Sequence, residues 1–182
     1  MAQDQLEVMQ VLGFSSFAVA GHDRGGRVAH RMAMDHHEHV TQLIVLDISP
    51  TRLIFARTDQ AFATAYYHWF FLIQPFDLPE RMIGADTSYY LRRKLNGWSS
   101  GLQHFDPLAL AEYERCFAMP ATVHATCADD RAAATTDLAH AAAAGPSRIR
   151  CPTPSLCRGK CPVTPLFAPI PDSKPGHGTL RV

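Results

Sequence analysis

The sequence lacks an excess of either charge and any apolar run long enough to cross a membrane. Lysine plus arginine equals aspartate plus glutamate, at 17 each in 182 residues. No net field therefore favours nucleic acid or an anionic membrane. The longest apolar-aromatic run, residues 61–73, is shorter than the roughly 20 residues that span a bilayer, and it contains His68. We expect neither nucleic acid nor a membrane as a partner.

Cysteine pairs with metal-ligand spacing are also missing. The five cysteines are an odd number and none has C-x2-C spacing, which favours free thiols over disulfides or a zinc site. The first residues carry acidic side chains where a secretory signal has a basic segment. The expected location is cytoplasmic, and no metal is expected.

Two short apolar runs separated by a helical pattern are present near the start of the chain. Residues 17–20 and 42–49 are apolar runs of strand length, and apolar residues recur at helical spacing over residues 28–33. An earlier helical pattern, residues 4–12, stops at Gly13. A strand, a helix and a strand joined by short connections predict two parallel strands in one sheet. The predicted fold class is α/β.

Composition divides the chain into three expected regions. Residues 1–50 form a partial sheet core, and residues 51–140 read as a helical, aromatic-rich cap. Residues 141–182 hold eight of the 13 prolines and keep neither helical nor strand periodicity, so this tail is expected to be poorly ordered. The alanine-rich stretch RAAATTDLAHAAAA before it is predicted to be helix.

The segment GHDRG, residues 21–25, has the form of the nucleophile elbow G-x-S-x-G with aspartate in place of serine. The chain reverses sharply there, so a side chain at Gly21 or Gly25 is predicted to collide with backbone. A carboxylate nucleophile forms an alkyl ester by substitution at saturated carbon or by opening an epoxide. Alternatively, Asp23 only caps the helix that follows.

Several separated motifs resemble the haloacetate dehalogenases of the α/β-hydrolase superfamily, especially the fluoroacetate dehalogenases. They are GHDRGGRVAHRMAMDH, LIVLDISPT, AYYHWFFLIQPFDLPERMIGAD, YYLRRKL, FDPLALAEYERCF and VHATCADDRAAATTDL. The resemblance spans approximately residues 1–150. It implies a partial α/β-hydrolase fold, with a fragment of parallel sheet and a helical cap.

The resemblance implies roles for residues around the elbow. Asp23 matches the nucleophile that attacks the halogen-bearing carbon, and Arg24 and Arg27 match the pair that holds the substrate carboxylate. A guanidinium grips a carboxylate in a bidentate manner. The alternative for the arginines is a solvated first helical turn. Asp47 matches the acid that orients the catalytic histidine, and its alternative is a polar loop or capping role.

In the cap, His68 and Trp69 match the halide-binding pair. Ring N–H donors that converge on a departing halide would stabilise the charge that grows in the transition state. An aromatic cluster that only fills the core is the alternative for these two residues.

Three departures from the family pattern are visible. The chain lacks the family's additional N-terminal sheet portion, with its H-G loop, and Asp130 stands where the halide site is expected to have a tyrosine. The tail keeps the I-x-C-P entry to a strand and then diverges. His177 is the one histidine in that tail and has no predicted strand before it, so the sequence identifies no catalytic base.

The resemblance thus predicts a hydrolase that acts on a haloacetate and water without a cofactor. An epoxide hydrolase of the same fold is the alternative enzyme, with Tyr66 or Tyr67 as the acid that protonates the epoxide. A non-catalytic truncated fragment is the alternative from a different class. The missing strands would leave sheet edges open to association, as in a homodimer.

Overall fold

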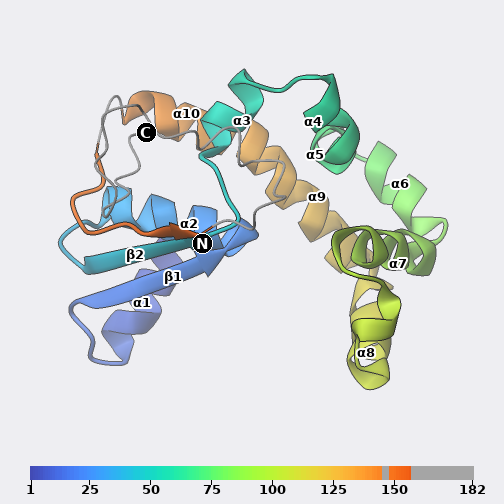
Figure 1. Ribbon diagram of the computed structural model, residues 1–182, viewed down its shortest axis with the longest axis horizontal. Helices are drawn as coiled ribbons and strands as arrows, with labels where there is room; N and C mark the ends of the chain where they lie inside the picture. The colour runs from blue at the N-terminus through green and yellow to red at the C-terminus, as the bar shows by residue number, and fades with distance from the viewer. Residues whose placement is uncertain (145–147, 157–182) are drawn as a thin grey trace. The chain divides into compact units, whose positions relative to one another are not determined.

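The computed structural model describes residues 1–144 and 148–156, which fall into two compact units. The first unit combines residues 1–59 with the described residues from 139 onward, and the second comprises residues 60–138. Figure 1 labels the helices and strands of both units. The cap was predicted to begin at residue 51, whereas the second unit begins at residue 60. Helix α3, Thr51–Ala56, follows strand β2 closely and belongs to the unit that contains the sheet.

The first unit contains a sheet of three parallel strands in the order β1-β2-β3 (Figure 1). Strand β1 is Phe17–His22, β2 is Val40–Leu46 and β3 is Ser155–Leu156. Along the β1–β2 pair, His22 is the register partner of Leu46. The predicted βαβ unit and the α/β fold class are confirmed.

Strand β3 comes from the region that was predicted to be poorly ordered. The backbone N–H groups of Leu43 and Val45 donate to the carbonyl oxygens of Pro152 and Pro154, over 3.0 and 3.2 Å. Proline has no N–H to donate, but its carbonyl oxygen can accept a hydrogen bond. Prolines can therefore stand in a strand at positions where only the carbonyl pairs with the neighbouring strand. Residues 148–156 therefore correct the expectation for the tail, while residues 157–182 lie outside the described ranges.

The helix α2, Asp23–Asp35, covers this sheet with one apolar face. The core of the unit joins that face to β2 and the residues after it: Ala29, Met32, Ala33, Val40, Leu43, Val45 and Ile48. Helix α1, Ala2–Val11, contacts α2 and is followed by Gly13 at φ 85°, the left-handed conformation that suits glycine. The helical stop predicted at Gly13 is confirmed.

The second unit is helical throughout its described elements. They are α4 Gln60–Ala65, α5 Tyr67–Leu72, α6 Leu78–Gly84, α7 Thr87–Trp98, the 3-10 helix Leu102–His104, α8 Pro107–Phe117 and α9 Pro120–Ala134. Asp86 and Asp106 cap α7 and α8, because their carboxylates accept from the backbone N–H of Tyr89 at 2.8 Å and of Leu108 at 2.9 Å. A small core unites α5, α6 and α9 through Leu72, Ile83, Val123 and Cys127.

The alanine-rich stretch predicted as one helix is divided. Helix α9 ends at Ala134, and α10 is Thr136–Ala143. The backbone of Thr135, at φ −127° and ψ −79°, leaves the helical region. Two adjacent β-branched threonines weaken the helix at this point. Within the described ranges, no helix combines the length and the apolar character that a membrane span requires.

Candidate active site

Two aspartates stand at the same edge of the sheet in the first unit. Asp23 directly follows β1 and Asp47 directly follows β2, and the last residues of these strands are register partners. The carboxyl edge of a parallel sheet is where open α/β folds place their reactive groups. The structure therefore brings the predicted nucleophile and the predicted orienting acid to one edge.

Both aspartates adopt the left-handed backbone conformation, with φ 51° at Asp23 and φ 50° at Asp47. This conformation costs an L-residue roughly 1–2 kcal/mol, although aspartate tolerates it better than most. Strain of this kind is common at functional sites, where the surrounding structure holds it in place. At Asp23 it produces the sharp turn from strand to helix that a nucleophile elbow requires.

Close packing of glycines holds the elbow. A Cβ at Gly21 would overlap the carbonyl oxygen of Gly25 and lie 2.6 Å from the Cα of Gly26. A Cβ at Gly26 would lie 3.0 Å from the Gly21 oxygen and 3.1 Å from the Cδ1 of Ile48. At Gly25 it would meet no atom within 4 Å. The collision predicted at Gly21 is confirmed, but the second constrained glycine is Gly26, because Gly25 faces open space from the first helical turn.

The helix that begins at the elbow carries the two predicted substrate arginines. Asp23 is the first residue of α2, and His22, in the capping position, makes no side-chain capping bond. Arg24 and Arg27 are three residues apart, so they lie on one helix face within the first two turns. Both are partly buried. The structure therefore places this cationic pair beside the turn at Asp23, on the same short segment.

The backbone of Asp47 is held by β3, the strand in the region that was expected to be poorly ordered. Its N–H donates to the carbonyl oxygen of Leu156 over 2.9 Å. Its carboxylate Oδ2 lies 3.9 Å from Nε2 of His22, which is longer than a hydrogen bond. The proposed orienting role of Asp47 stays a prediction, and His177 lies outside the described residues.

The predicted halide pair lies in the second unit, on the short helix α5. His68 and Trp69 are both buried, with 6% and 5% of their surfaces exposed. The His68 ring lies edge-on to Trp98, with 4.7 Å between the ring centroids, and Tyr66 and Tyr67 flank it at 5.6 and 6.0 Å. His68 is thus surrounded by aromatic rings.

Lys94 and Trp98 belong to the same cluster and were not singled out from the sequence. The Nζ of Lys94 lies 4.0 Å from the centroid of the Tyr67 ring and 5.0 Å from that of Trp98. Burial lowers the pKa of Lys94 to about 8, although the Asp130 carboxylate opposes this shift. The available signal was the spacing of Lys94 and Trp98, four residues apart within the region predicted to be helical, which puts both on one face of a helix.

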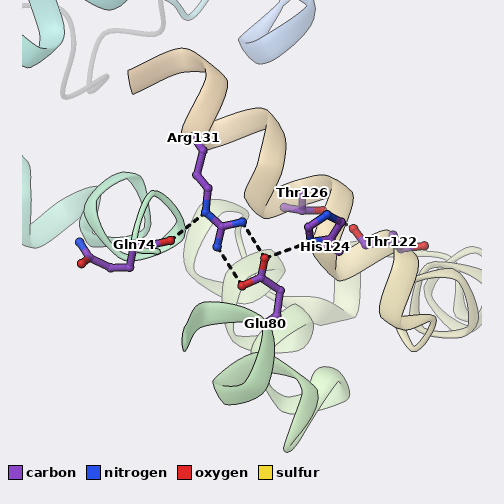
Figure 2. Close-up of polar contacts among 6 residues, drawn as sticks. All are labelled: Gln74, Glu80, Thr122, His124, Thr126 and Arg131. Atoms are coloured by element: carbon purple, nitrogen blue, oxygen red, sulfur yellow. Dashed lines mark hydrogen bonds and ion pairs between the residues drawn. The ribbon is translucent and has the colours of Figure 1, made fainter. Parts of the chain in front are cut away.

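A network of charged hydrogen bonds ties α9 to α6 in this unit. The Nη1 and Nη2 atoms of Arg131 donate to the two carboxylate oxygens of Glu80 over 2.7 and 2.9 Å. Arg131 Nε donates to the backbone oxygen of Gln74 at 2.8 Å, and His124 Nδ1 lies 3.2 Å from Glu80 (Figure 2). The pKa of the Glu80 carboxyl is lowered to about 2, chiefly by the hydrogen bonds that Arg131 donates to it. The network fixes the part of α9 next to Asp130.

The geometry thus divides the six predicted site residues between the two units. Asp23, Arg24, Arg27 and Asp47 gather at one sheet edge and the helix that leaves it, and His68 and Trp69 belong to the other unit. The combination of a strand, an elbow with close-packed glycines, a helix and a second parallel strand defines an α/β hydrolase. Residues 1–153 match the family model for the alpha/beta hydrolase fold, and the chain belongs to that family.

Two similar proteins are named for different reactions, a dehalogenation and an epoxide hydrolysis. The chain is 49% identical to a fluoroacetate dehalogenase of Burkholderia sp over 138 residues, which is 75% of this chain and 45% of the relative. It is 33% identical to a soluble epoxide hydrolase of Corynebacterium sp. (strain C12) over 133 residues, which is 70% and 46% of the two chains. The chain therefore spans about half the length of these relatives.

Solved structures agree with the fold. One from Nostoc sp PCC 7120, provisionally named an alpha/beta hydrolase, superposes with a TM-score of 0.86 at 55% identity. It covers 91% of this chain and 57% of that structure. Another, a provisionally named epoxide hydrolase from Pseudomonas aeruginosa, has a TM-score of 0.82 at 39% identity and covers 99% and 57%. The resemblance to the α/β hydrolases noted in the sequence is confirmed.

Proposed function

We propose that Asp23 displaces halide from a 2-haloacetate and becomes esterified in the process. One carboxylate oxygen of Asp23 attacks the methylene carbon, and the carbon–halogen bond breaks as the halide leaves with its electron pair. The product is a carboxymethyl ester on Asp23. The observation that carries the proposal is the left-handed backbone of Asp23 between β1 and α2, the conformation of a nucleophile elbow.

The charges around the elbow support an anionic substrate. Asp23 is itself an anion, so a haloacetate approaching it is repelled unless cations lie nearby. Arg24 and Arg27 follow Asp23 on the same helix, and the N–H groups at the start of α2 add positive potential. Both features lower the cost of bringing two anions together.

Mass spectrometry of the full chain after incubation with bromoacetate tests the proposal. We expect one carboxymethyl group on the peptide that contains Asp23, with one equivalent of bromide released and no adduct in Asp23→Asn. Asp59→Asn is a matched control, since Asp59 is an exposed aspartate remote in sequence from the elbow. A chain that releases no halide and gains no mass on Asp23 contradicts the proposal.

Opening of an epoxide by the same carboxylate is the second candidate. It is favoured by the 33% identity to the Corynebacterium epoxide hydrolase over 70% of this chain. Tyr66 and Tyr67, the candidates from the sequence for the acid that protonates the epoxide oxygen, belong to the second unit. Formation of a styrene oxide adduct on Asp23 without any reaction with bromoacetate or fluoroacetate would decide for this candidate.

A further inference from the structure

The segment that returns to the sheet, residues 148–156, is tied to the end of α2 by a hydrogen bond to a histidine. Nη1 of Arg150 lies 2.8 Å from Nε2 of His37, two residues beyond the last residue of α2. A guanidinium is always protonated in proteins and can only donate, so Nε2 must be the acceptor. The bond therefore requires a neutral His37 ring, with its proton on Nδ1.

A carboxylate near the other ring nitrogen competes for the same histidine. Oε2 of Glu38 lies 3.5 Å from Nδ1 of His37. The pKa of Glu38 is held below its ordinary value of 4.5, chiefly by a hydrogen bond to its own backbone and further by the neighbouring histidines. Glu38 is therefore an anion throughout the pH range in which histidines gain a proton. A protonated His37 ring can pair with Glu38, but it has no lone pair left to accept from Arg150.

Both partners of the bond between Arg150 and His37 are open to solvent, so the pH of the solution acts on it directly. Arg150 is exposed, and so is 41% of the His37 side chain. Asp35, the carboxylate at the end of α2, is already bound by Arg31, whose Nε donates to it over 2.6 Å. The other charged or titratable groups on these stretches of chain are Glu38, His36 and His39 on the turn after α2 and Arg148 on the returning segment.

The segment that contains Arg150 also holds the backbone of Asp47. Its strand β3 has two residues, and the second of them, Leu156, accepts the Asp47 N–H over 2.9 Å. Ile149 and Cys151, on either side of Arg150, are partly buried against the core of the first unit. A strand this short can open locally while the rest of the unit stays folded. The loss of a hydrogen bond at the start of the segment therefore shifts the balance toward opening.

We propose that His37 and Arg150 form a pH-sensitive latch on the segment that holds Asp47. With a neutral ring, Arg150 donates to His37 and the segment stays on β2. A proton from solution that binds Nε2 removes the acceptor and sets two cations against each other, so Arg150 leaves and the ring pairs with Glu38. The segment then opens more often, and the Asp47 N–H loses its bond to Leu156 more often. All of these residues belong to the first unit, and the latch does not depend on the proposed reaction.

Hydrogen-exchange mass spectrometry of the full chain at pH 7.5 and pH 5.5 tests the latch. The readout is exchange in peptides that cover residues 43–47, where three N–H groups donate to the returning segment. Variants are compared at the same pH, so that the effect of pH on the exchange chemistry cancels. At pH 5.5 we expect the unmodified chain to exchange about three- to tenfold faster than His37→Gln, the usual value of one hydrogen bond. At pH 7.5 the two should exchange equally, because the glutamine oxygen accepts from Arg150 and does not titrate.

Three further variants separate the latch from other effects of charge. His37→Lys places a permanent cation at the same position, so it should exchange about three- to tenfold faster than the unmodified chain at pH 7.5. His36→Gln removes the adjacent histidine, and as the matched control it should keep the pH dependence of the unmodified chain. Glu38→Gln should move the faster exchange to lower pH, because the carboxylate no longer favours the protonated ring.

The opening must also be local. Peptides of α2 that carry Ala29 and Met32, two residues of the core, should stay protected at both pH values in the unmodified chain and in His37→Lys. Equal acceleration in α2 and in residues 43–47 would mean that the whole unit unfolds, and it would overturn the assignment. So would a His37→Lys variant that exchanges like the unmodified chain at pH 7.5, or an unmodified chain that matches His37→Gln at both pH values.

Discussion

At the scale of single residues, the two left-handed aspartates define the site. Asp23 and Asp47 have nearly the same φ, 51° and 50°, and each directly follows a strand. The sequence predicted the first through the glycines around it. LIVLDISPT pointed to Asp47 through the resemblance but not to its left-handed backbone, and its N–H bonds to Leu156, a residue more than a hundred positions away.

The glycines of the elbow give a stability prediction with an internal control. Gly21→Ala places a Cβ on the Gly25 carbonyl oxygen, and backbone cannot move aside cheaply, so we expect a loss of about 2–3 kcal/mol or more in the free energy of unfolding. Gly25→Ala meets open space in the first turn of α2 and should be neutral or stabilising by about 0.5–1 kcal/mol. Urea denaturation of both variants measures the difference. Equal losses at the two positions would contradict the packing described here.

His30 on α2 predicts a dependence of stability on pH. Its Nε2 is buried and has no hydrogen-bond partner among residues 1–144 and 148–156, and burial, with the charge of Arg31, lowers its pKa below the ordinary 6.5. The unfolded chain therefore binds the proton more readily than the folded one. Stability should fall as pH drops below about 6.5 and continue falling toward the lower folded pKa.

His30→Met should flatten this slope, because the residue that titrates is replaced by an apolar side chain of similar reach. The measurement is the urea midpoint at pH 7.5 and pH 5.5. His140→Gln, which replaces an exposed histidine on α10, is the control and should keep the slope of the unmodified chain. The same slope in His30→Met as in the control would exclude His30 as its source.

At the scale of elements, the ion pair of Glu80 and Arg131 joins α6 to α9 across 51 residues of sequence. The Glu80 carboxylate is 10% exposed and accepts two bonds from Arg131. We expect Glu80→Gln to cost about 1–3 kcal/mol, because a charged hydrogen-bonded pair is broken away from solvent. The contribution should be complete above pH 4.5 and decline as pH falls toward about 2.

An ion pair on the surface tests whether burial is the reason why Glu80→Gln is expected to lower stability. Glu112 also bonds to an arginine, Arg115, and its pKa is likewise about 2, but both side chains are more than half exposed. Solvent screens such pairs, so Glu112→Gln should leave the thermal midpoint unchanged. If Glu112→Gln and Glu80→Gln lower the midpoint equally, the role assigned to burial is wrong.

Helices and strands that follow from the apolar periodicity of their own residues could be predicted from the sequence. Those that depend on contacts with residues far away in the sequence could not. The strands and the helix of the βαβ unit follow from apolar periodicity and from Gly13 and Gly21. Strand β3 has two residues, and its formation depends on β2 rather than on its own composition. Likewise, Lys94 and Trp98 are four residues apart, but only the fold of the second unit shows that both lie on α7 and that Tyr67 and His68 meet them.

At the scale of the whole molecule, the sheet leaves one side of β1 without a partner strand among residues 1–144 and 148–156. Within the described residues, β1 pairs with β2 alone, and Ala18 and Ala20 on it are exposed. An open strand edge is a template for pairing with another chain. We expect concentration-dependent association in analytical ultracentrifugation, reduced in Ala18→Lys because a lysine on an edge strand opposes such pairing.

The matched control is Thr41→Lys, an exposed position on the inner strand β2. This variant adds the same charge without changing the open edge, so it should associate as the unmodified chain does. Association that is equally weakened by both substitutions would point to net charge rather than to the edge. A chain that stays monomeric at every concentration would contradict the prediction altogether.

The distance along the chain between β2 and β3 sets the order in which this fold can assemble. Ser155 pairs with Val45, 110 residues earlier, and the whole second unit is inserted between them. Closing so long a loop is slow compared with joining neighbouring segments. Strand β1, helix α2 and strand β2 can therefore form while the rest of the chain is still being synthesised. We therefore expect the turn at Asp23 to form early, and Asp47 to gain its backbone bond to Leu156 only when the returning segment arrives.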